Sequence, residues 1–185
     1  EHALSLSASP KGVKEIDLER YQGVWHQLSA IPTKFQRKCV SNTTAEYELL
    51  DTGKVKVINS CDKENGERKV GEGRARINPE FDSTSKLEVT FVKLFGWIWA
   101  FGGDYWIHYL DEDYQVAIVG DPKLKYGWIL SRSESRTVEE YGYLEQIVES
   151  IGYDSCQFVM SETNDQAFDE ETRLCELGTF FYNEY

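Results

Sequence analysis

The chain of 185 residues has no long apolar run and no excess of basic side chains. Nowhere are ten consecutive residues apolar, so we expect neither a transmembrane helix nor a retained signal peptide. Lys and Arg number 20 against 32 Asp and Glu, which gives a formal net charge of −12. Nucleic acids and anionic surfaces bind clustered Lys and Arg, so this balance disfavours nucleic acid as a partner and predicts a solvated acidic surface.

The sequence also lacks the short motifs of common hydrolases and zinc sites. It contains no G-x-S-x-G, no H-E-x-x-H and no C-x-x-C. These patterns would place a nucleophilic serine, a catalytic zinc or a structural zinc, respectively. The adjacent carboxylates Asp111, Glu112 and Asp113 are typical of a turn and carry no acid/base information in so acidic a chain. We therefore expect no catalysis, no metal and no cofactor.

Eight short segments alternate apolar and polar residues, as strands with one buried face do. They are residues 23–31, 42–49, 54–59, 71–77, 86–91, 105–110, 114–120 and 126–131. Regular spacing and turns such as 51–53 and 121–123 favour a meander of antiparallel strands. The prediction is an all-β fold, an eight-stranded antiparallel up-and-down β-barrel. Closure removes the exposed sheet edges and leaves room for one small ligand.

One amphipathic helix is predicted after the last strand, from about residue 135 to Ile151, with Gly152 ending it. Its apolar residues share one face, which must pack on the outside of the barrel. They are Val138, Tyr141, Leu144, Ile147, Val148 and Ile151. We expect an N-terminal arm at 1–15, the barrel with its helix at 16–160, and a C-terminal extension at 161–185. The extension adds a strand, covers an opening or mediates association.

A pair of residues far apart in the sequence supports closure. Trp25 lies on the first predicted strand, and Arg132 follows the last. In a closed barrel the guanidinium would lie on the indole face, a cation–π contact of about 0.5–2 kcal/mol, with donors left for backbone carbonyls. Gly23 would let the chain pass close beneath.

Together these motifs resemble the lipocalin family, nearest to its bacterial lipocalin and apolipoprotein D group. The matching segments are residues 20–25, 35–39, 44–47, 53–59, 86–91, 104–107 and 126–132. They occur in order and with family-like spacing over about residues 16–160. The resemblance implies a non-catalytic barrel that binds, transports or sequesters a small hydrophobic ligand.

The four cysteines predict two disulfides and an exported protein in an oxidising compartment, because lipocalins are usually exported. Three connectivities are open. We favour Cys39–Cys61 with Cys156–Cys175, since the first pair brackets one hairpin and the second closes a C-terminal loop. The rival pairing, Cys39–Cys175 with Cys61–Cys156, resembles the tail-to-barrel bridges of other lipocalins.

Strand alternation and the resemblance together predict the residues that line the cavity. The resemblance to apolipoprotein D points to Tyr47, Asn59 and Trp128. The full set is Tyr47, Val57, Asn59, Ala75, Phe91, Trp106, His108 and Trp128. Lys63, near the expected mouth, is a candidate partner for a carboxylate or phosphate. The aromatic segment from Trp97 to Phe101 is a candidate hydrophobic rim, with peripheral membrane contact as one use.

Aromatic lining with a few polar groups suits an apolar ligand with one polar end. Fatty acid or lysophospholipid is the leading class, by resemblance to the bacterial lipocalin. A bilin, carotenoid or retinoid is the alternative. A protein-interaction module and a xanthophyll-modifying enzyme are further alternatives, but the chain lacks the additional domains of plant xanthophyll de-epoxidases. His2, His26 and His108 lie on segments that the barrel separates, which argues against a catalytic cluster.

Overall fold

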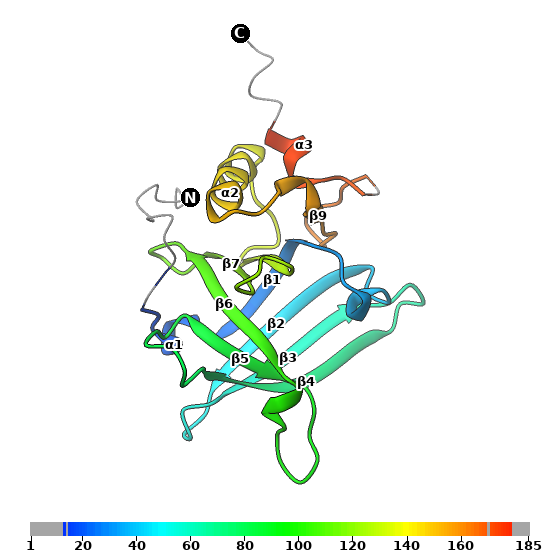
Figure 1. Ribbon diagram of the computed structural model, residues 1–185. Coiled ribbons are helices and arrows are strands. Elements are labelled where there is room, and N and C mark those ends of the chain that lie inside the picture. The colour runs from blue at the N-terminus through cyan, green and yellow to red at the C-terminus, as the bar shows by residue number, and fades with distance from the viewer. Residues whose placement is uncertain (1–12, 14, 170, 179–185) are drawn as a thin grey trace.

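The computed structural model describes residues 13, 15–169 and 171–178, and its main body is a closed antiparallel β-barrel (Figure 1). The barrel strands are β1 (Gly23–Ala30), β2 (Ser41–Leu49), β3 (Val55–Asp62), β4 (Arg68–Ile77), β5 (Lys86–Thr90), β6 (Gly103–Leu110), β7 (Val116–Gly120) and β8 (Gly127–Ser131). Each pairs with its sequence neighbour, and β1 pairs with both β2 and β8. The predicted eight-stranded up-and-down barrel is therefore confirmed.

The structure adds a ninth strand that the sequence did not predict. β9 (Val159–Met160) pairs with the end of β1, where β2 no longer follows β1. The chain then bridges the two diverging strands. The Ser161 amide donates to the Leu28 carbonyl, and the Asn42 amide donates to the Glu162 carbonyl, both at 2.9 Å. The segment after β9 thus fills the gap between the diverging ends of β1 and β2.

The barrel has two different ends, which we call the floor and the mouth. Helix α1 (Leu18–Tyr21) lies beside the floor, where β1 begins and β8 ends. The mouth is formed by the connections at residues 31–40, 63–67, 91–102 and 121–126. Two of these carry short 3-10 helices, η1 (Lys34–Gln36) and η2 (Trp99–Phe101).

Two apolar cores stabilise the fold, one inside the barrel and one outside it. The inner core includes Trp25, Tyr47, Val57, Leu87 and Leu130. The outer core lies between the barrel wall and α2 (Val138–Ile151), so β7 is buried on both faces instead of one. Thr137 and Glu140 form a capping box at the start of α2, and Gly152 ends the helix.

Two further helices correct the expectation of a single helix. They are α1 and the C-terminal α3 (Leu174–Gly178), and a short 3-10 helix, η3 (Ser155–Gln157), precedes β9. α2, α3 and β9 lie together on one side of the barrel in Figure 1. Leu174 and Leu177 are buried in the outer core, and the Cys156–Cys175 disulfide ties α3 to η3. Most of the predicted arm, 1–12 and 14, lies outside the described residues.

Candidate functional site: the barrel interior and its mouth

The floor is closed by the contact between Trp25 and Arg132. The guanidinium carbon lies 3.8 Å from the indole centroid, and Trp25 is fully buried. Arg132 also donates to the carbonyls of Tyr114, Val24 and Arg20 at 3.2, 3.1 and 3.0 Å. Gly23 has a φ of +99°, and a Cβ there would lie 3.1 Å from Nη1 of Arg132. The arginine therefore links both ends of the sheet at one point.

Above the floor, three tyrosines form a buried hydroxyl cluster that the sequence did not indicate. The Tyr105 hydroxyl lies 2.7 Å from those of Tyr21 and Tyr47. Burial raises the pKa of Tyr47 to about 12 and raises the pKa of Tyr21 and Tyr105 well above 10. All three phenols are therefore neutral at neutral pH. Of the three, only Tyr47 was singled out from the sequence, as a lining residue.

Six of the eight predicted lining residues lie on the inner face. Tyr47, Val57 and Ala75 are buried in the inner core, and Trp128 packs against it. Asn59 occupies the same face of β3 as Val57 and is exposed. Phe91 is 45% exposed, and its ring lies directly against Gly73, where a Cβ would come within 2.8 Å of it. Their part in ligand binding stays a prediction.

Trp106 and His108 are on the outside of the barrel, so their expected place in the cavity is wrong. Tyr105 and Ile107 take the inner positions of β6, and a register shift between Ile107 and Tyr109 interrupts the alternation. The Trp106 ring packs edge-on against Phe81, 5.4 Å between centroids, and beneath Lys86. These two side chains belong to the outer wall.

His108 has a structural environment. Its ring packs edge-on against Tyr153, and Nε2 lies 3.2 Å from the Asp121 carbonyl oxygen. Because a carbonyl only accepts, Nε2 carries the proton and donates. Burial lowers the pKa of His108 below its usual value, against a smaller opposing effect of Asp121. The neutral ring is therefore favoured, and His108 contributes to packing on the outer wall.

The segment that begins at Trp97 lies partly against the outer wall. Trp97 and Trp99 are covered by the guanidinium groups of Arg74 and Arg76, at 4.8 and 4.2 Å from the ring centroids. Leu94, Phe95 and Phe101 are largely exposed instead. The loop that carries them projects from the barrel in Figure 1. We call Leu94, Phe95 and Phe101 the apolar tip.

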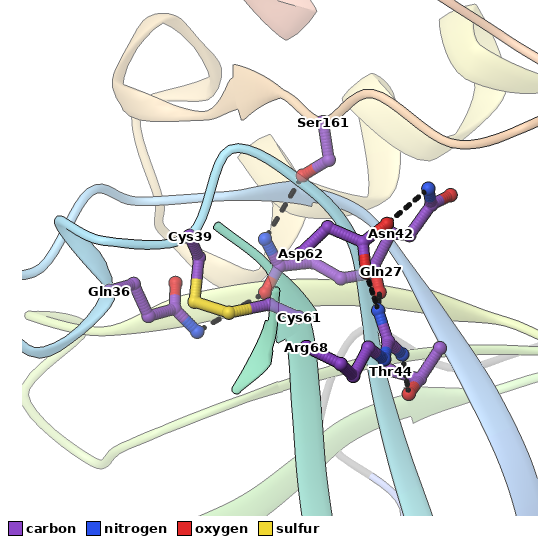
Figure 2. The surroundings of a disulfide bond; sticks show 9 residues. All are labelled: Gln27, Gln36, Cys39, Asn42, Thr44, Cys61, Asp62, Arg68 and Ser161. Atoms are coloured by element: carbon purple, nitrogen blue, oxygen red, sulfur yellow. Dashed lines mark hydrogen bonds and ion pairs between the residues drawn. A yellow bond between two sulfur atoms is a disulfide. The ribbon is translucent and has the colours of Figure 1, made fainter. Parts of the chain in front are cut away.

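At the mouth, the Cys39–Cys61 disulfide ties the loop after β1 to the end of β3 (Figure 2). The favoured cysteine pairing is thus confirmed, with Cys156–Cys175 as the second bond. Gln36, in the same loop, donates to Gln27 of β1 at 3.4 Å.

The predicted Lys63 lies beside this disulfide in a pocket with four other basic side chains that the sequence did not single out.

No group of three or more His, Cys, Asp or Glu within the described ranges could hold a metal ion. In that same part of the chain, no helix is long and apolar enough to cross a membrane.

Comparisons with known proteins match this architecture. A family model described as a Lipocalin-like domain matches residues 16–163. The chain is 40% identical over 144 residues to temperature-induced lipocalin-1 of Arabidopsis thaliana, covering 77% of this chain and 76% of that protein. It is 35% identical over 149 residues to the outer membrane lipoprotein Blc of Vibrio cholerae, covering 79% and 80%. Among solved structures, insecticyanin from the tobacco hornworm Manduca sexta aligns with a TM-score of 0.66 at 22% identity, covering 86% of this chain and 87% of that one.

Proposed function

The chain belongs to the lipocalin family, and we propose that it binds a fatty acid or lysophospholipid in its barrel and carries or sequesters it without catalysis. Lipocalins bind small hydrophobic ligands, which leaves the ligand class to be argued from this barrel. The observation that carries the proposal is the uneven filling of the inner wall between floor and mouth.

The inner positions of β3 and β4 are filled unevenly: Cys61 at the mouth end is buried with its disulfide and Ile77 at the floor end is 37% exposed, while buried and exposed positions lie between them. On β3, Val55 and Val57 are buried and Asn59 is exposed. On β4, Ala75 is buried and Lys69 is exposed. Between these two, β4 offers only Gly71 and Gly73 to the inner face, and the Phe91 ring from the connection after β5 covers Gly73. An unbranched alkyl chain fits along Gly71 and beside that ring, and its burial contributes about 25 cal/mol per Å².

The lipid class is supported further by the resemblance to the bacterial lipocalin group. The structural likeness to insecticyanin, at 22% identity, concerns the fold and does not favour a pigment. Two disulfides favour an oxidising compartment, so we propose an exported carrier.

Tryptophan fluorescence during titration with palmitate or a lysophospholipid tests this proposal. We expect quenching or a spectral shift with micromolar affinity, a binding free energy of about −8 kcal/mol. Trp128→Ala should weaken binding, because it removes aromatic area at the inner wall. Trp97→Ala is the matched control, since Trp97 lies on the outer wall over Arg74 and should leave the affinity unchanged.

An absorption spectrum and native mass spectrometry of the purified protein complete the test. A visible band would replace the lipid proposal with the pigment alternative. If no lipid mass appears and the parent binds neither palmitate nor lysophospholipid, a protein partner becomes the better hypothesis. A folded Trp128→Ala protein with unchanged affinity would move the site away from the inner face of β8.

We infer, in addition, that the apolar tip makes peripheral membrane contact. Leu94 and Phe95 are exposed side by side at the mouth, and Phe101 is 71% exposed. Trp97 and Trp99 are held on the outer wall, so the contact rests on these three residues. Flotation with phosphatidylcholine vesicles should show binding that Phe95→Ser reduces severalfold. Equal flotation of parent and variant would contradict the contact.

A further inference from the structure

The mouth contains a pocket of about 380 Å³, and all the residues with described side chains that line it are basic. They are Lys34, Arg37, Lys38, Lys63 and Lys69. The chain as a whole carries a net charge of −12 with 20 basic residues, so a quarter of its positive side chains gather in this one place. Such local concentration against an acidic background creates a positive potential at the entrance of the barrel.

The pocket is assembled from three segments that the Cys39–Cys61 disulfide holds together. Lys34, Arg37 and Lys38 come from the loop after β1, which ends at Cys39. Cys61 is the direct partner of Lys69 in the pairing of β3 with β4. The disulfide, shown in Figure 2, therefore fixes the basic loop to β3, the strand that pairs with the strand carrying Lys69.

Protein carboxylates neutralise little of this charge. Lys63 pairs with Glu67 at 2.7 Å. Among the described residues, no ion pair joins a carboxylate to any of the other four. The neighbouring Arg68, on the outer wall, differs from the pocket residues because protein groups satisfy its guanidinium. It donates to the Asn42 carbonyl, to Asp62 and to Thr44 at 2.6, 2.9 and 3.0 Å, so its guanidinium is used within the protein (Figure 2).

Cations held close together repel one another, and a bound anion would offset that repulsion by attracting each of them. Below the pocket, the inner face of β4 runs from Lys69 to Gly71 and Gly73, with Phe91 against the second glycine. A ligand with its charge among the lysines would thus have its tail along Gly71 and beside the Phe91 ring that covers Gly73. The positive charge of the pocket and the shape of the inner wall both favour a ligand with its head group at the mouth and its tail in the barrel.

We propose that the basic pocket binds the anionic head group, a phosphate or carboxylate, of the amphiphile whose tail lies in the barrel. The protein then selects anionic amphiphiles over neutral ones with the same tail, and the Cys39–Cys61 disulfide maintains that selection. This inference rests on the proposed lipid-binding function and adds the charge of the ligand to it.

Tetradecanoate and tetradecanol, which share a tail length, are the probes. By fluorescence titration at low ionic strength, the parent should bind the acid at least about tenfold more tightly than the alcohol, the equivalent of about 1.4 kcal/mol. The double variant Lys38→Gln with Lys69→Gln should lose most of that preference and keep its affinity for the alcohol. High salt should reduce the preference, because the pocket is partly open to solvent.

The double variant Lys54→Gln with Lys56→Gln is the matched control. It removes the same charge at the floor-side turn and on the outer wall, and the preference for the acid should persist. The pair Cys39→Ser with Cys61→Ser should lower the preference severalfold without weakening alcohol binding. An unchanged preference in that protein would overturn the role of the disulfide.

Three results would overturn the head-group site, and each is distinct. Equal micromolar affinities of the parent for acid and alcohol would reject it and leave the lipid-binding function standing. Binding of neither probe would reject the proposed function itself. If inorganic phosphate alone binds as tightly as tetradecanoate, and the alcohol does not compete with it, the pocket is a free-anion site independent of the barrel ligand.

Discussion

Arg132 makes more contacts than its partly exposed position suggests. One side chain stacks on Trp25 and satisfies three backbone carbonyls that come from three segments of the chain. Those carbonyls belong to residues 20, 24 and 114, so the arginine joins α1, β1 and the turn before β7. Its loss would affect the floor and leave the mouth intact.

Replacing Arg132 with Ala is therefore expected to lower the free energy of unfolding by about 1–3 kcal/mol, through the lost cation–π contact and the unsatisfied carbonyls. Arg132→Lys keeps the charge without the planar fork and should recover only part of the loss. Chemical denaturation measures both. An Arg132→Ala protein as stable as the parent would show that the contact does not stabilise the fold.

The contact between Trp25 and Arg132 at the floor was predictable from the sequence, but the inner and outer faces of β6 were predicted the wrong way round. Trp25 and Arg132 could be recognised because each stands at a fixed place in a motif, Trp25 on the first strand and Arg132 directly after the last. Trp106 and His108 were expected inside because alternation alone does not say which face of a strand is the inner one. That choice depends on the pairing of Tyr105 with Leu87 and on the register shift after Ile107, which are tertiary features.

Local signals explain which helices were predictable. α2 has a long apolar face and a capping box, both visible in the sequence. α3 has five residues and follows a polar acidic segment, so it is too short to show a helical repeat of apolar residues in the sequence. Its position comes from the Cys156–Cys175 bond and from the burial of Leu174 against α2.

α3 is expected to stabilise the outer core and to have no part in ligand binding. Leu174 is 0% exposed, so Leu174→Ala should lower the free energy of unfolding by about 2–4 kcal/mol, through lost burial and the cavity it leaves. Leu94→Ala, at a position 65% exposed, is the matched control and should change stability by about 0.5 kcal/mol or less. Denaturation curves and fluorescence titrations of both proteins check this. Loss of lipid affinity in a stable Leu174→Ala protein would place the extension in the binding site.

The two ends of the barrel differ: side chains fill the floor, and the mouth is open and positively charged. The floor holds the buried Trp25 and the neutral tyrosine cluster, which fix the closed end of the sheet. The mouth holds exposed inner positions, the basic pocket and the apolar tip. Sequence reasoning predicted the closure. It did not predict the basic pocket, because its cations come from three segments that only the folded sheet and the Cys39–Cys61 bond bring together.

A ligand with its head at the mouth and its tail in the barrel should stabilise the whole fold, because unfolding destroys its site. At a free concentration 100 times the dissociation constant, the gain is about 2.7 kcal/mol. For a chain of this length that corresponds to a rise in Tm of about 5–10 °C. Delipidated protein should therefore melt lower than the same protein with palmitate, and the difference should grow with the logarithm of ligand concentration. Butyrate, which carries the same carboxylate without a long tail, is the control and should shift Tm little. If palmitate leaves Tm unchanged at concentrations that saturate the fluorescence signal, the fatty acid binds the unfolded chain as well as the barrel, and the barrel is not its specific site.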